Sequence, residues 1–436
     1  MANGQRPMAN GNKVKVKVLI VNTSGNVGGA AIAASRLMHA LRSQGVEADM
    51  LSRKKKFPAF YWERLVIWVS NLFSRKNIFA VDIANSGQHI THSPQFREAD
   101  IIHLHWVNQG FISLSELGRI LSSGKPVVWT MHDMWPFTSV CHYSGTCRQY
   151  HSQCSQCPLL QSSPCRDTLV RQTFSRKARI YAPAPITFVG CSKWIADQAR
   201  QSALLAGKTI VHIPNTIDTS LFAPMDRQQC RKAFLLPPDR KLILFTSQKV
   251  TDPRKGIRFL YEAIQLLLHQ NPQLADQTAL IILGGKSGAT DADLPVDPAT
   301  ARFLRHNSYP LPYTSSAREM AQIYNSTDLF LIPSLQDNLP NTVMEALSCG
   351  VPCVGFRTGG IPEMIDHKVN GYVARQSDSQ DLKEGIVWAL SHDLSQPARQ
   401  KVLSTYSPEA IAERYIQEYT QLLQNLDSIE NNKVTK

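Results

Sequence analysis

The sequence predicts an α/β protein built from two doubly wound, Rossmann-like domains that face each other across a central cleft. Apolar segments of strand length alternate with helical segments in both halves of the chain, and this alternation is typical of parallel sheets covered by helices. Loops rich in glycine or charge follow several of these strands in each half, where such sheets bind ligands. The 436 residues suffice for two or three domains with full-sized cores.

The composition is that of an ordinary globular protein, with 43% hydrophobic and 19% charged residues. The net charge of +13 favours acidic partners, namely nucleotide phosphates, nucleic acid or an anionic membrane face, without choosing among them. Residues 1–13 and 427–436 are polar, and we expect a disordered tail at the first end and a loose one at the second. The first tail lacks the apolar core of a signal peptide, and no run of about eighteen apolar residues indicates a membrane span. A cytoplasmic protein is therefore expected.

The first domain is expected over residues 14–218. Its first buried strand, Val14 to Asn22, runs into a loop that holds Gly28 and Gly29 before a helix. Glycines in this position let backbone amides approach a phosphate or sugar at the helix N-terminus, and a tight turn that needs small residues explains them equally well. The spacing is not G-x-G-x-x-G, so a dinucleotide-binding fold is poorly supported.

Histidines follow two neighbouring apolar segments of this domain. The segment Asp100 to Trp106 contains His103 and His105 near its end, and the segment Val127 to Asp133 contains His132 at its carboxyl end. That end of a parallel strand is where a ligand-contacting side chain belongs. A histidine satisfied within the core is the alternative for His132, and its position favours a functional role.

Residues 57–79 form a helical segment rich in aromatic and aliphatic side chains. Basic residues flank it at Arg53 to Lys56 and again at Arg75 and Lys76. Aromatic side chains on one face with flanking cations fit a helix that lies in a membrane interface. A helix packed against the core fits the same pattern equally well, so both interpretations stay open.

An insertion over residues 141–165 holds five of the nine cysteines. Clustered cysteines in a chain that lacks a signal peptide indicate a metal or free thiols rather than disulfides. Cys154 and Cys157 form the C-x2-C half of a zinc knuckle, which Cys141 and Cys147 complete as a four-thiolate site. Because the full spacing C-x5-C-x6-C-x2-C is not a standard zinc pattern, a structural zinc and a set of reduced thiols are equal alternatives.

A linker is expected over residues 219–240, where prolines and charges cluster, and the second domain over residues 241–405. In the loop after its first strand, Lys249, Arg254 and Lys255 precede a helix. Cations beside a helix N-terminus form a cradle for a pyrophosphate. A solvated charge cluster is the alternative interpretation of the same residues.

The most informative segment of the second domain, Leu331 to Phe356, has the pattern strand, loop, helix, strand. The helix opens near Pro340 and closes at Gly350, which are the residue types that helix ends prefer. Asp337 in the loop and Glu345 in the early helix both lie toward the ligand side of such a crossover unit. A capping residue and a solvated helix residue are the alternatives.

Asp337 to Glu345, followed by ALSCGVPCV, resembles the E-x7-E element of GT-B glycosyltransferases of family 4. The T-x-H-D context of His132, I-P-N-x-I-D at residues 213–218 and G-G-I-P-E at residues 359–363 resemble the same family. The resemblance spans nearly the whole chain. It implies the GT-B fold, in which a C-terminal helix, here residues 406–426, returns to the first domain.

The resemblance also implies a role for each matching residue. His132 and Asp337 position the transferred sugar, and Glu345 accepts hydrogen bonds from the ribose hydroxyls of the donor. The cations Lys249, Arg254 and Lys255 stabilise the leaving diphosphate. The residues expected to act in catalysis are His132, Asp337 and Lys255. The donor site is completed by Gly28, Gly29, Asn338, Leu339, Gly359, Gly360 and Glu363.

Two positions depart from the family pattern. Asp337 stands where the family has Glu and is one methylene shorter, so its reach toward the donor sugar is in doubt. Lys249 stands where the family has Arg, and bidentate contact with the diphosphate is lost at that position. The donor preference is therefore where this chain is expected to differ from its relatives.

The activity that the resemblance implies is retaining transfer of a sugar from a UDP- or GDP-sugar to a hydroxyl of a glycan or lipid-linked acceptor, in cell-surface polysaccharide biosynthesis. No cofactor is expected for catalysis and no nucleic acid as partner, and peripheral contact through residues 57–79 would place the enzyme at the inner membrane face. Two alternatives stay open. One is a non-transferase relative of the same fold, a sugar-nucleotide epimerase or an inactive scaffold. The other is a basic nucleic-acid-binding protein with a zinc knuckle, against which the long apolar strands speak.

Overall fold

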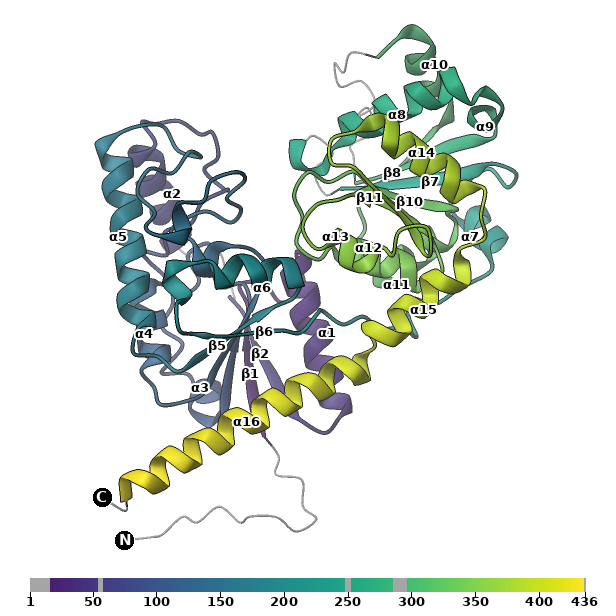
Figure 1. Ribbon diagram of the computed structural model, residues 1–436. Helices are drawn as coiled ribbons and strands as arrows, with labels where there is room; N and C mark the ends of the chain where they lie inside the picture. The colour runs from purple at the N-terminus through teal and green to yellow at the C-terminus, as the bar shows by residue number, and fades with distance from the viewer. Residues whose placement is uncertain (1–15, 54–57, 248–251, 285–295, 435–436) are drawn as a thin grey trace.

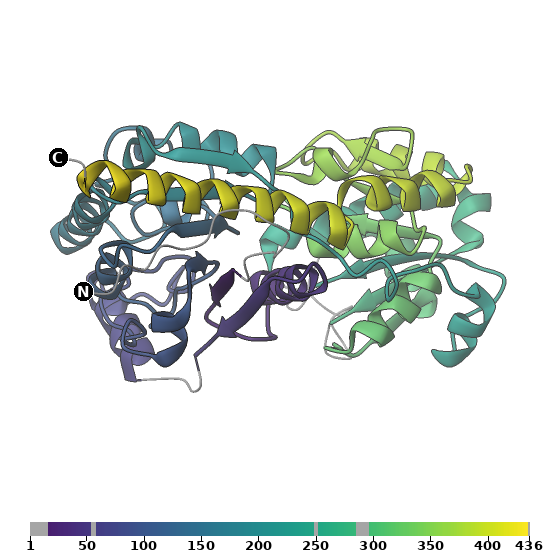
Figure 2. The same cartoon turned by 90° about the horizontal axis from the view of Figure 1, so that it is seen from below.

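A computed structural model of the chain describes residues 16–53, 58–247, 252–284 and 296–434 (Figure 1). Two α/β domains lie side by side, and the long C-terminal helix extends from the second domain along the first, as Figure 2 shows from below. Each domain contains one parallel sheet with helices on both faces, which is the doubly wound architecture that the sequence predicts. Within the described residues, no helix is both long enough and apolar enough to span a membrane.

The first domain is built on a six-stranded parallel sheet in the order β2-β1-β3-β4-β5-β6. Its central strands are continuous apolar runs that are buried along their whole length, as a sheet covered on both faces requires. The strands are β1 (Lys17–Val21), β2 (Glu47–Leu51), β3 (Ile101–Leu104), β4 (Val127–Met131), β5 (Ile186–Gly190) and β6 (Thr209–His212). The helices are α1 (Gly29–Ser43), α2 (Pro58–Ser70), α3 (Pro94–Glu98), α4 (Leu114–Leu121), α5 (Pro164–Tyr181) and α6 (Lys193–Arg200), with short 3-10 turns η1 (Trp135–Phe137), η2 (Gln149–His151) and η3 (Ala203–Leu205).

The second domain repeats this plan with the strand order β12-β11-β10-β7-β8-β9, again all parallel. The strands are β7 (Lys241–Thr246), β8 (Thr278–Leu283), β9 (Ser308–Leu311), β10 (Leu329–Ile332), β11 (Cys353–Phe356) and β12 (Gly371–Ala374). The helices are α7 (Arg227–Ala233), α8 (Ile257–Gln270), α9 (Pro272–Asp276), α10 (Pro298–Asn307), α11 (Ala317–Asn325), α12 (Asn341–Ser348), α13 (Ile361–Met364), α14 (Ser379–Leu390) and α15 (Ser395–Thr405), and the 3-10 turn η4 (Pro253–Lys255) precedes α8.

Each sheet has a point at which the order of its strands reverses. In the second sheet β7 lies between β8 and β10, and in the first sheet β1 lies between β2 and β3. Open α/β sheets bind ligands outside the carboxyl ends of the strands at such switch points. The loops that follow β7 and β10 are those in which the sequence places the expected cations and Asp337.

The helix of the informative segment forms where the sequence places it. Pro340 is the N-cap residue of α12 rather than its first helical residue, and the helix ends before Gly350, whose φ of 77° lies in the left-handed region that glycine adopts readily. Residues 343–348 of α12 are all buried, between the sheet, α11 and α15. This burial fixes the direction of the loop that carries Asp337.

The C-terminal helix α16 (Pro408–Val434) follows α15 of the second domain and packs on the first domain. Its buried residues share an apolar cluster with α1 and β1, and they are Ile411, Ala412, Tyr415 and Tyr419. The helix continues to Val434, so the expectation of a loose tail is wrong for residues 427–434. The segment expected as a linker, residues 219–240, contains α7, which packs on α11. The expected disordered residues 1–13 lie outside the described part.

Candidate active site

The loops at the carboxyl ends of the strands in both sheets contact each other between the domains. Asn338, in the loop after β10, donates from Nδ2 to the carbonyl oxygen of His132 at 3.0 Å and to that of Met131 at 3.2 Å. Asn341, at the start of α12, donates to the carbonyl oxygen of Gly29 at 3.0 Å. Residues that the sequence singled out for separate reasons therefore lie at one domain interface.

Lys255 and Asp337 form an ion pair at the switch point of the second sheet. The Nζ of Lys255 lies 2.6 Å from Oδ2 of Asp337, and the two side chains are 32% and 15% exposed. The pair joins the end of η4 to the loop after β10, on either side of the switch point. Because an anionic ligand competes with a carboxylate for the same ammonium group, this pair is suited to exchange Asp337 for a phosphate oxygen.

Arg254 lies beside this pair and links it to the cysteine-containing insertion. Its guanidinium donates to Oδ2 of Asp252 at 2.8 Å and lies 5.6 Å from the ring centre of Tyr143. The following helix α8 begins after Gly256, which provides no side-chain cap, so its first N–H groups are available to an anion. Lys249, the third expected cation, lies outside the described residues.

Glu345 is nearly buried, with 6% of its surface exposed, and both of its carboxylate oxygens have protein partners. Oε1 lies 2.6 Å from Nη2 of Arg36 on α1, and Oε2 accepts a hydrogen bond from the hydroxyl of Tyr324 at 3.0 Å. The Nη1 of Arg36 is buried and has no hydrogen-bond partner among the described residues. Sequence reasoning missed Arg36, although it lies one and a half to two turns along the helix that follows the expected glycine loop.

His132 is the outer member of a row of three histidines. Its Nε2 lies 2.8 Å from Nδ1 of His105, and the ring of His105 lies tilted by 37° against that of His103 with centres 4.4 Å apart. Burial lowers the pKa of His132 to about 4 and that of His103 to about 3, and the pKa of His105 lies well below its usual value. All three are therefore neutral imidazoles near pH 7.

The row fixes which nitrogen of His132 carries its proton. A neutral imidazole has one N–H, and the Nε2 of His105 is buried with no partner among the described residues. We assign the proton of His105 to Nδ1, because an N–H left unpaired in the core is costly. His105 then donates to Nε2 of His132, and His132 carries its own proton on Nδ1.

Asp133 and His142 are a buried pair that sequence reasoning did not select. Oδ2 of Asp133 lies 2.7 Å from Nδ1 of His142 and accepts from Nε1 of Trp106 at 2.7 Å. Burial raises the pKa of Asp133, but the charge and hydrogen bonds of His142 and other donors outweigh burial and lower it overall. The signal that could have found this pair is the acid of the T-x-H-D motif, which anchors the insertion beside His132.

Two of the expected glycines are required by close packing of the backbone. Gly359 has a φ of 53°, and a Cβ there would lie 1.6 Å from the carbonyl oxygen of Asp337. A Cβ at Gly360 would lie 2.2 Å from the carbonyl oxygen of Asn338. Gly28 has a φ of 95° and open space around it, and it forms the N-cap of α1 before Gly29. Gly359 and Gly360 therefore let the loop of Asp337 approach the neighbouring backbone closely.

Three expected donor-site residues are used in contacts within the protein. Asn338 is 3% exposed and hydrogen-bonds across the interface, and Leu339 is 6% exposed within the core of the second domain. Both carboxylate oxygens of Glu363 accept backbone N–H groups at the start of α6, from Lys193 and from Trp194, each at 2.8 Å. Glu363 thus caps a helix of the other domain, a role that its sequence context does not reveal.

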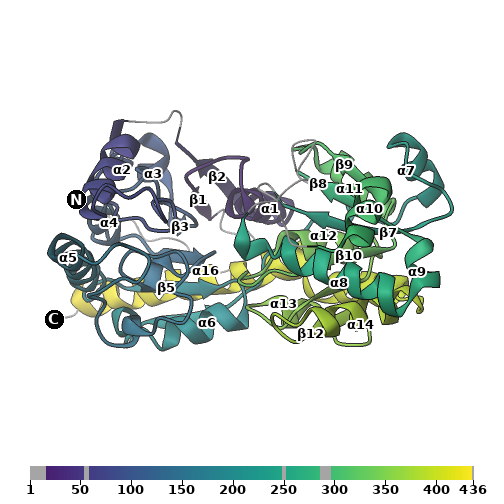
Figure 3. The ribbon, with the colours of Figure 1, turned by 90° about the horizontal axis from the view of Figure 1, so that it is seen from above.

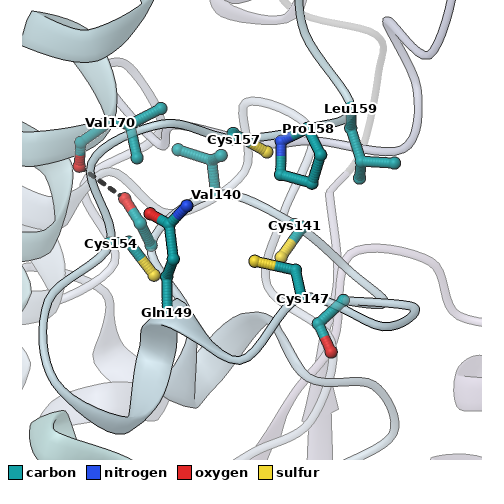
Figure 4. Close-up of a pocket in the computed structure, with 11 residues that line it drawn as sticks. Val140, Cys141, Cys147, Gln149, Cys154, Cys157, Pro158, Leu159 and Val170 are labelled. Carbon is teal, nitrogen blue, oxygen red and sulfur yellow. Dashed lines mark hydrogen bonds between the residues drawn. The ribbon is translucent and has the colours of Figure 1, made fainter.

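All nine cysteines of the chain are free. Cys141, Cys147, Cys154 and Cys157 line one pocket (Figure 4). Burial raises the pKa of Cys154 to about 11, so this side chain is a thiol rather than a thiolate. As the described side chains stand, no group of three or more His, Cys, Asp or Glu is placed to hold a metal ion. The four thiols therefore share a pocket without converging on one point.

Two doubly wound domains whose loops meet between them define the GT-B class of glycosyltransferases. Two family models match the chain, Glycosyltransferase Family 4 over residues 27–221 and Glycosyl transferases group 1 over residues 226–408. The chain belongs to this group 1 and family 4 glycosyltransferase family.

Similar solved structures cover nearly the whole chain. The sucrose-phosphate synthase of Thermosynechococcus elongatus matches with a TM-score of 0.63 and 18% identity, over 94% of this chain and 100% of that one. HepE of Anabaena, solved in complex with UDP and glucose, matches with a TM-score of 0.59 and 16% identity, over 93% of this chain and 100% of that one. At these identities the likeness shows the fold.

Similar curated proteins are also glycosyl-transferring enzymes by name. The N-acetyl-alpha-D-glucosaminyl L-malate synthase of Bacillus anthracis is 21% identical over 413 residues, which cover 92% of this chain and 96% of that one. The D-inositol 3-phosphate glycosyltransferase of Saccharomonospora viridis is 26% identical over 201 residues, only 44% of either chain. The chain thus spans less than half the length of several relatives that it matches.

Proposed function

We propose that the chain is a retaining glycosyltransferase that moves a sugar from a UDP- or GDP-sugar to a hydroxyl of a glycan or lipid-linked acceptor. The observation that carries this proposal is the Lys255–Asp337 pair at the switch point of the second sheet, close to the contacts that Asn338 makes with the backbone of His132. Lys255 is a cation that can bind an anionic ligand, and it lies near His132, the residue proposed to contact the sugar. The solved HepE structure with UDP and glucose supports a donor of this chemical class.

The leaving group of this reaction is a nucleoside diphosphate, whose negative charge grows as the bond to the sugar breaks. Lys255, Arg254 and the free N–H groups at the start of α8 stabilise that charge more strongly in the transition state than in the bound donor. These positive groups neutralise the diphosphate without a metal ion, so we propose that catalysis needs no cofactor. Lys249 is proposed to join them from the same loop.

The sugar and the nucleoside are held by the remaining site residues. His132 donates from Nδ1 to a sugar oxygen, and Asp337, released from Lys255, accepts from a sugar hydroxyl. Glu345 accepts from the ribose hydroxyls with the lone pairs that Arg36 and Tyr324 leave free. We propose retention by departure and attack on one face of the sugar, because no separate carboxylate nucleophile is evident among the described residues of the site.

The acceptor side of the proposal rests on the family resemblance. We infer a glycan or lipid-linked acceptor, a place in cell-surface polysaccharide biosynthesis and a location in the cytoplasm at the inner membrane face. The reaction class fixes only that the acceptor presents a hydroxyl and that the step before it supplies an activated sugar nucleotide. Purified acceptor pools from envelope glycans test this part separately from donor use.

The deciding experiment measures release of UDP or GDP from a panel of sugar nucleotides in the presence of acceptor extracts. Lys255→Ala is expected to lower kcat/KM by about a hundredfold, because a charged group at the leaving diphosphate is lost. Lys401→Ala is the matched control, since Lys401 pairs with Asp366 at 2.9 Å and both residues belong to the second domain. The proposal would be overturned if the Lys255→Ala variant released UDP or GDP as fast as the wild type. Interconversion of the sugar without release of the nucleotide would indicate the epimerase alternative.

A further inference from the structure

The helix α2 exposes apolar residues and buries its charged ones, which is the reverse of an ordinary surface helix. Its exposed residues recur at helical spacing and are apolar or aromatic: Tyr61 at 61%, Trp62 at 56%, Leu65 at 45% and Val69 at 48% exposure. Its two charged residues, Glu63 and Arg64, face the protein and are 0% and 7% exposed. Surface helices normally bury the apolar stripe and expose the charges.

Specific contacts hold the helix in this orientation. Arg64 donates to the carbonyl oxygen of Val81 at 3.0 Å and to Oδ2 of Asp82 at 3.2 Å. Oε1 of Glu63 accepts from the backbone N–H of Ile83 at 2.9 Å. Turning the apolar face inward would break these bonds and leave buried polar groups unpaired, which is unfavourable. The outward apolar face is therefore built into the fold.

The turn after α2 extends the same apolar surface. Leu72 and Phe73 have φ values of 51° and 58°, in the left-handed region that side chains other than glycine rarely adopt, and they are 56% and 62% exposed. Trp68 holds this turn, because its Nε1 donates to the carbonyl oxygen of Phe73 at 2.6 Å and the two rings lie 4.9 Å apart. The backbone of this turn is thus held in an unfavourable conformation that exposes large apolar side chains to solvent.

Exposed large apolar side chains are concentrated in this one stretch. Among the described residues thirteen such side chains are exposed, and seven of them lie between positions 61 and 79. We call these seven the α2 surface; they are Tyr61, Trp62, Leu65, Val69, Leu72, Phe73 and Phe79. Single exposed apolar residues are ordinary, whereas a contiguous group of this kind marks a surface that contacts something apolar.

The exposed charges within the stretch that carries the α2 surface are of one sign. Arg75 and Lys76 are exposed between Phe73 and Phe79, and the only acid within the described residues 58–81 is the buried Glu63. The chain as a whole carries a net charge of +13. Aromatic rings beside lysine and arginine suit the boundary between the headgroups and the acyl chains of an anionic bilayer.

The α2 surface lies at the end of the first domain that faces away from the second domain, as Figures 1 and 3 show. The start of α2 packs on the loop after β3, where a Cβ at Gly110 would lie 2.6 Å from the backbone nitrogen of Phe60. That loop is at the carboxyl edge of the first sheet, on the side where the two domains place their site residues. A membrane at the α2 surface would leave the domain interface free.

We propose that the α2 surface, together with Arg75 and Lys76, binds an anionic membrane face. The inference goes beyond the proposed transferase activity and does not depend on it, because membrane binding requires no donor or acceptor. Binding of a second copy would bring two sets of Arg75 and Lys76 together without exposed carboxylates in this stretch to pair them, so a bilayer is the occupant that the charges favour.

The test is cosedimentation of the full chain with vesicles of phosphatidylcholine alone and of phosphatidylcholine with phosphatidylglycerol. The wild type is expected to bind the anionic vesicles, and Trp62→Ser combined with Phe73→Ser is expected to weaken binding by at least about tenfold, since two interfacial aromatic anchors are lost. Arg75→Glu combined with Lys76→Glu is expected to remove the preference for the anionic lipid. Leu235→Ser is the matched control, because Leu235 is 88% exposed but lies in the segment before β7.

Two results would overturn the proposal. One is that the wild type and the variant with Trp62→Ser and Phe73→Ser bind vesicles equally, or that neither binds them. The other is a concentration-dependent dimer in sedimentation velocity that the serine variant abolishes while vesicles are not bound, which would assign the surface to a second copy. The urea midpoint of each variant shows that it is folded, since all changed residues are exposed. Nucleotide release with a soluble acceptor, measured in parallel, separates failure of this proposal from failure of the transferase proposal.

Discussion

The Nη2 of Arg36 lies 2.6 Å from Oε1 of Glu345, in an ion pair that joins α1 of the first domain to α12 of the second. Both side chains are largely buried, at 13% and 8% exposure. The carboxylate that the sequence assigns to the donor ribose is therefore also a bridge between the domains. The proposed contact with the donor and the observed contact between the domains thus use the same carboxylate.

Arg36→Ala is expected to lower the free energy of unfolding by about 3 kcal/mol, because it leaves the carboxylate of Glu345 nearly buried and unpaired. Urea denaturation measures this loss. Arg42→Ala on the same helix is the control: Arg42 pairs with Asp49 at 2.8 Å, but the side chains are 45% and 67% exposed. Its ion pair is expected to contribute less than about 1 kcal/mol. Equal losses for the two variants would show that the Arg36–Glu345 pair has no special role.

The coupling of this pair can be isolated in a double-mutant cycle with Arg36→Ala and Glu345→Ala. The doubly changed chain is expected to be more stable than the sum of the single losses predicts, by about 1–3 kcal/mol, because no unpaired charge remains. Additive losses would contradict the interpretation. Nucleotide affinity of Arg36→Ala, measured by titration calorimetry, then shows whether freeing Glu345 strengthens or weakens donor binding.

Lys255 and Asp337 are expected to change nucleotide binding in opposite directions. Lys255→Ala removes a positive charge from the diphosphate site and is expected to weaken UDP or GDP binding by about ten- to a hundredfold. Asp337→Ala removes the carboxylate that competes for the same ammonium group, so nucleotide binding is expected to be unchanged or tighter while sugar transfer falls. Calorimetry with the free nucleotide and a turnover assay with the donor measure the two effects. Equal weakening by both variants would place Asp337 on the nucleotide side of the site.

Gly359→Ala is expected to displace the loop that carries Asp337. A Cβ there would lie 1.6 Å from the carbonyl oxygen of Asp337, so the backbone must shift as well as tolerate a φ of 53°. Gly145→Ala is a matched control, because its φ is 57° and no atom lies within 4 Å of its Cβ. The control is expected to lose about 1 kcal/mol of stability, and Gly359→Ala is expected to lose more and to abolish transfer. Full activity of Gly359→Ala would show that the loop relaxes without cost.

The sequence predicts the two domains and most strands because their apolar runs and glycine-rich loops are local patterns. The contacts that build the site are different in kind. Three contacts join residues that are far apart in the sequence. Arg36 and Glu345 are separated by 309 positions, His132 and Asn338 by 206 positions, and Lys193 and Glu363 by 170 positions. No local periodicity encodes such pairs, because they depend on how the two domains dock.

The orientation of α2 likewise depends on long-range contacts that the local sequence does not encode. Its periodicity showed one face with aromatic and aliphatic side chains, but the direction of that face depends on where Glu63 and Arg64 find partners. Those partners, Ile83 and Asp82, lie in a stretch without regular structure after the helix. Only the folded chain decides between a helix packed on the core and one presented to the outside.

Stability is expected to fall as the pH drops from about 6.5 to about 4, because the unfolded chain binds protons on histidines that the folded chain keeps neutral. The groups concerned include His132, with a pKa of about 4, His103, with a pKa of about 3, and His105, whose pKa burial lowers well below its usual value. Each contributes a loss of about 1.4 kcal/mol per pH unit below the unfolded pKa. Urea denaturation along this pH range measures the slope. His132→Gln is expected to flatten it by about one proton, while His306→Gln, which changes an exposed histidine on α10, serves as the control.

The insertion that contains the cysteines packs beside the site, since Tyr143 lies under Arg254 and His142 pairs with Asp133. From position 138 to position 163 the described chain forms little regular structure apart from the turn η2, and a loop of this length is uncommon in a compact domain without a stabilising contact. Cys141, Cys147, Cys154 and Cys157 line its pocket and offer the four soft ligands that zinc prefers. A zinc ion would require these side chains to turn toward one point.

A structural zinc predicts about one zinc ion per chain after extensive dialysis, because four cysteines can satisfy a tetrahedral site, whereas reduced thiols predict none. Cys154→Ser is expected to lose the metal and to become more sensitive to proteases within residues 141–165, because the loop loses its link to the pocket. Cys165→Ser is the control, since Cys165 is exposed and does not line the pocket. Zinc content by mass spectrometry of the metal and thiol titration give complementary readings. Four reactive thiols and no zinc in the wild type would assign the cluster to reduced cysteines, and nucleotide release by Cys154→Ser would then be expected to match the wild type.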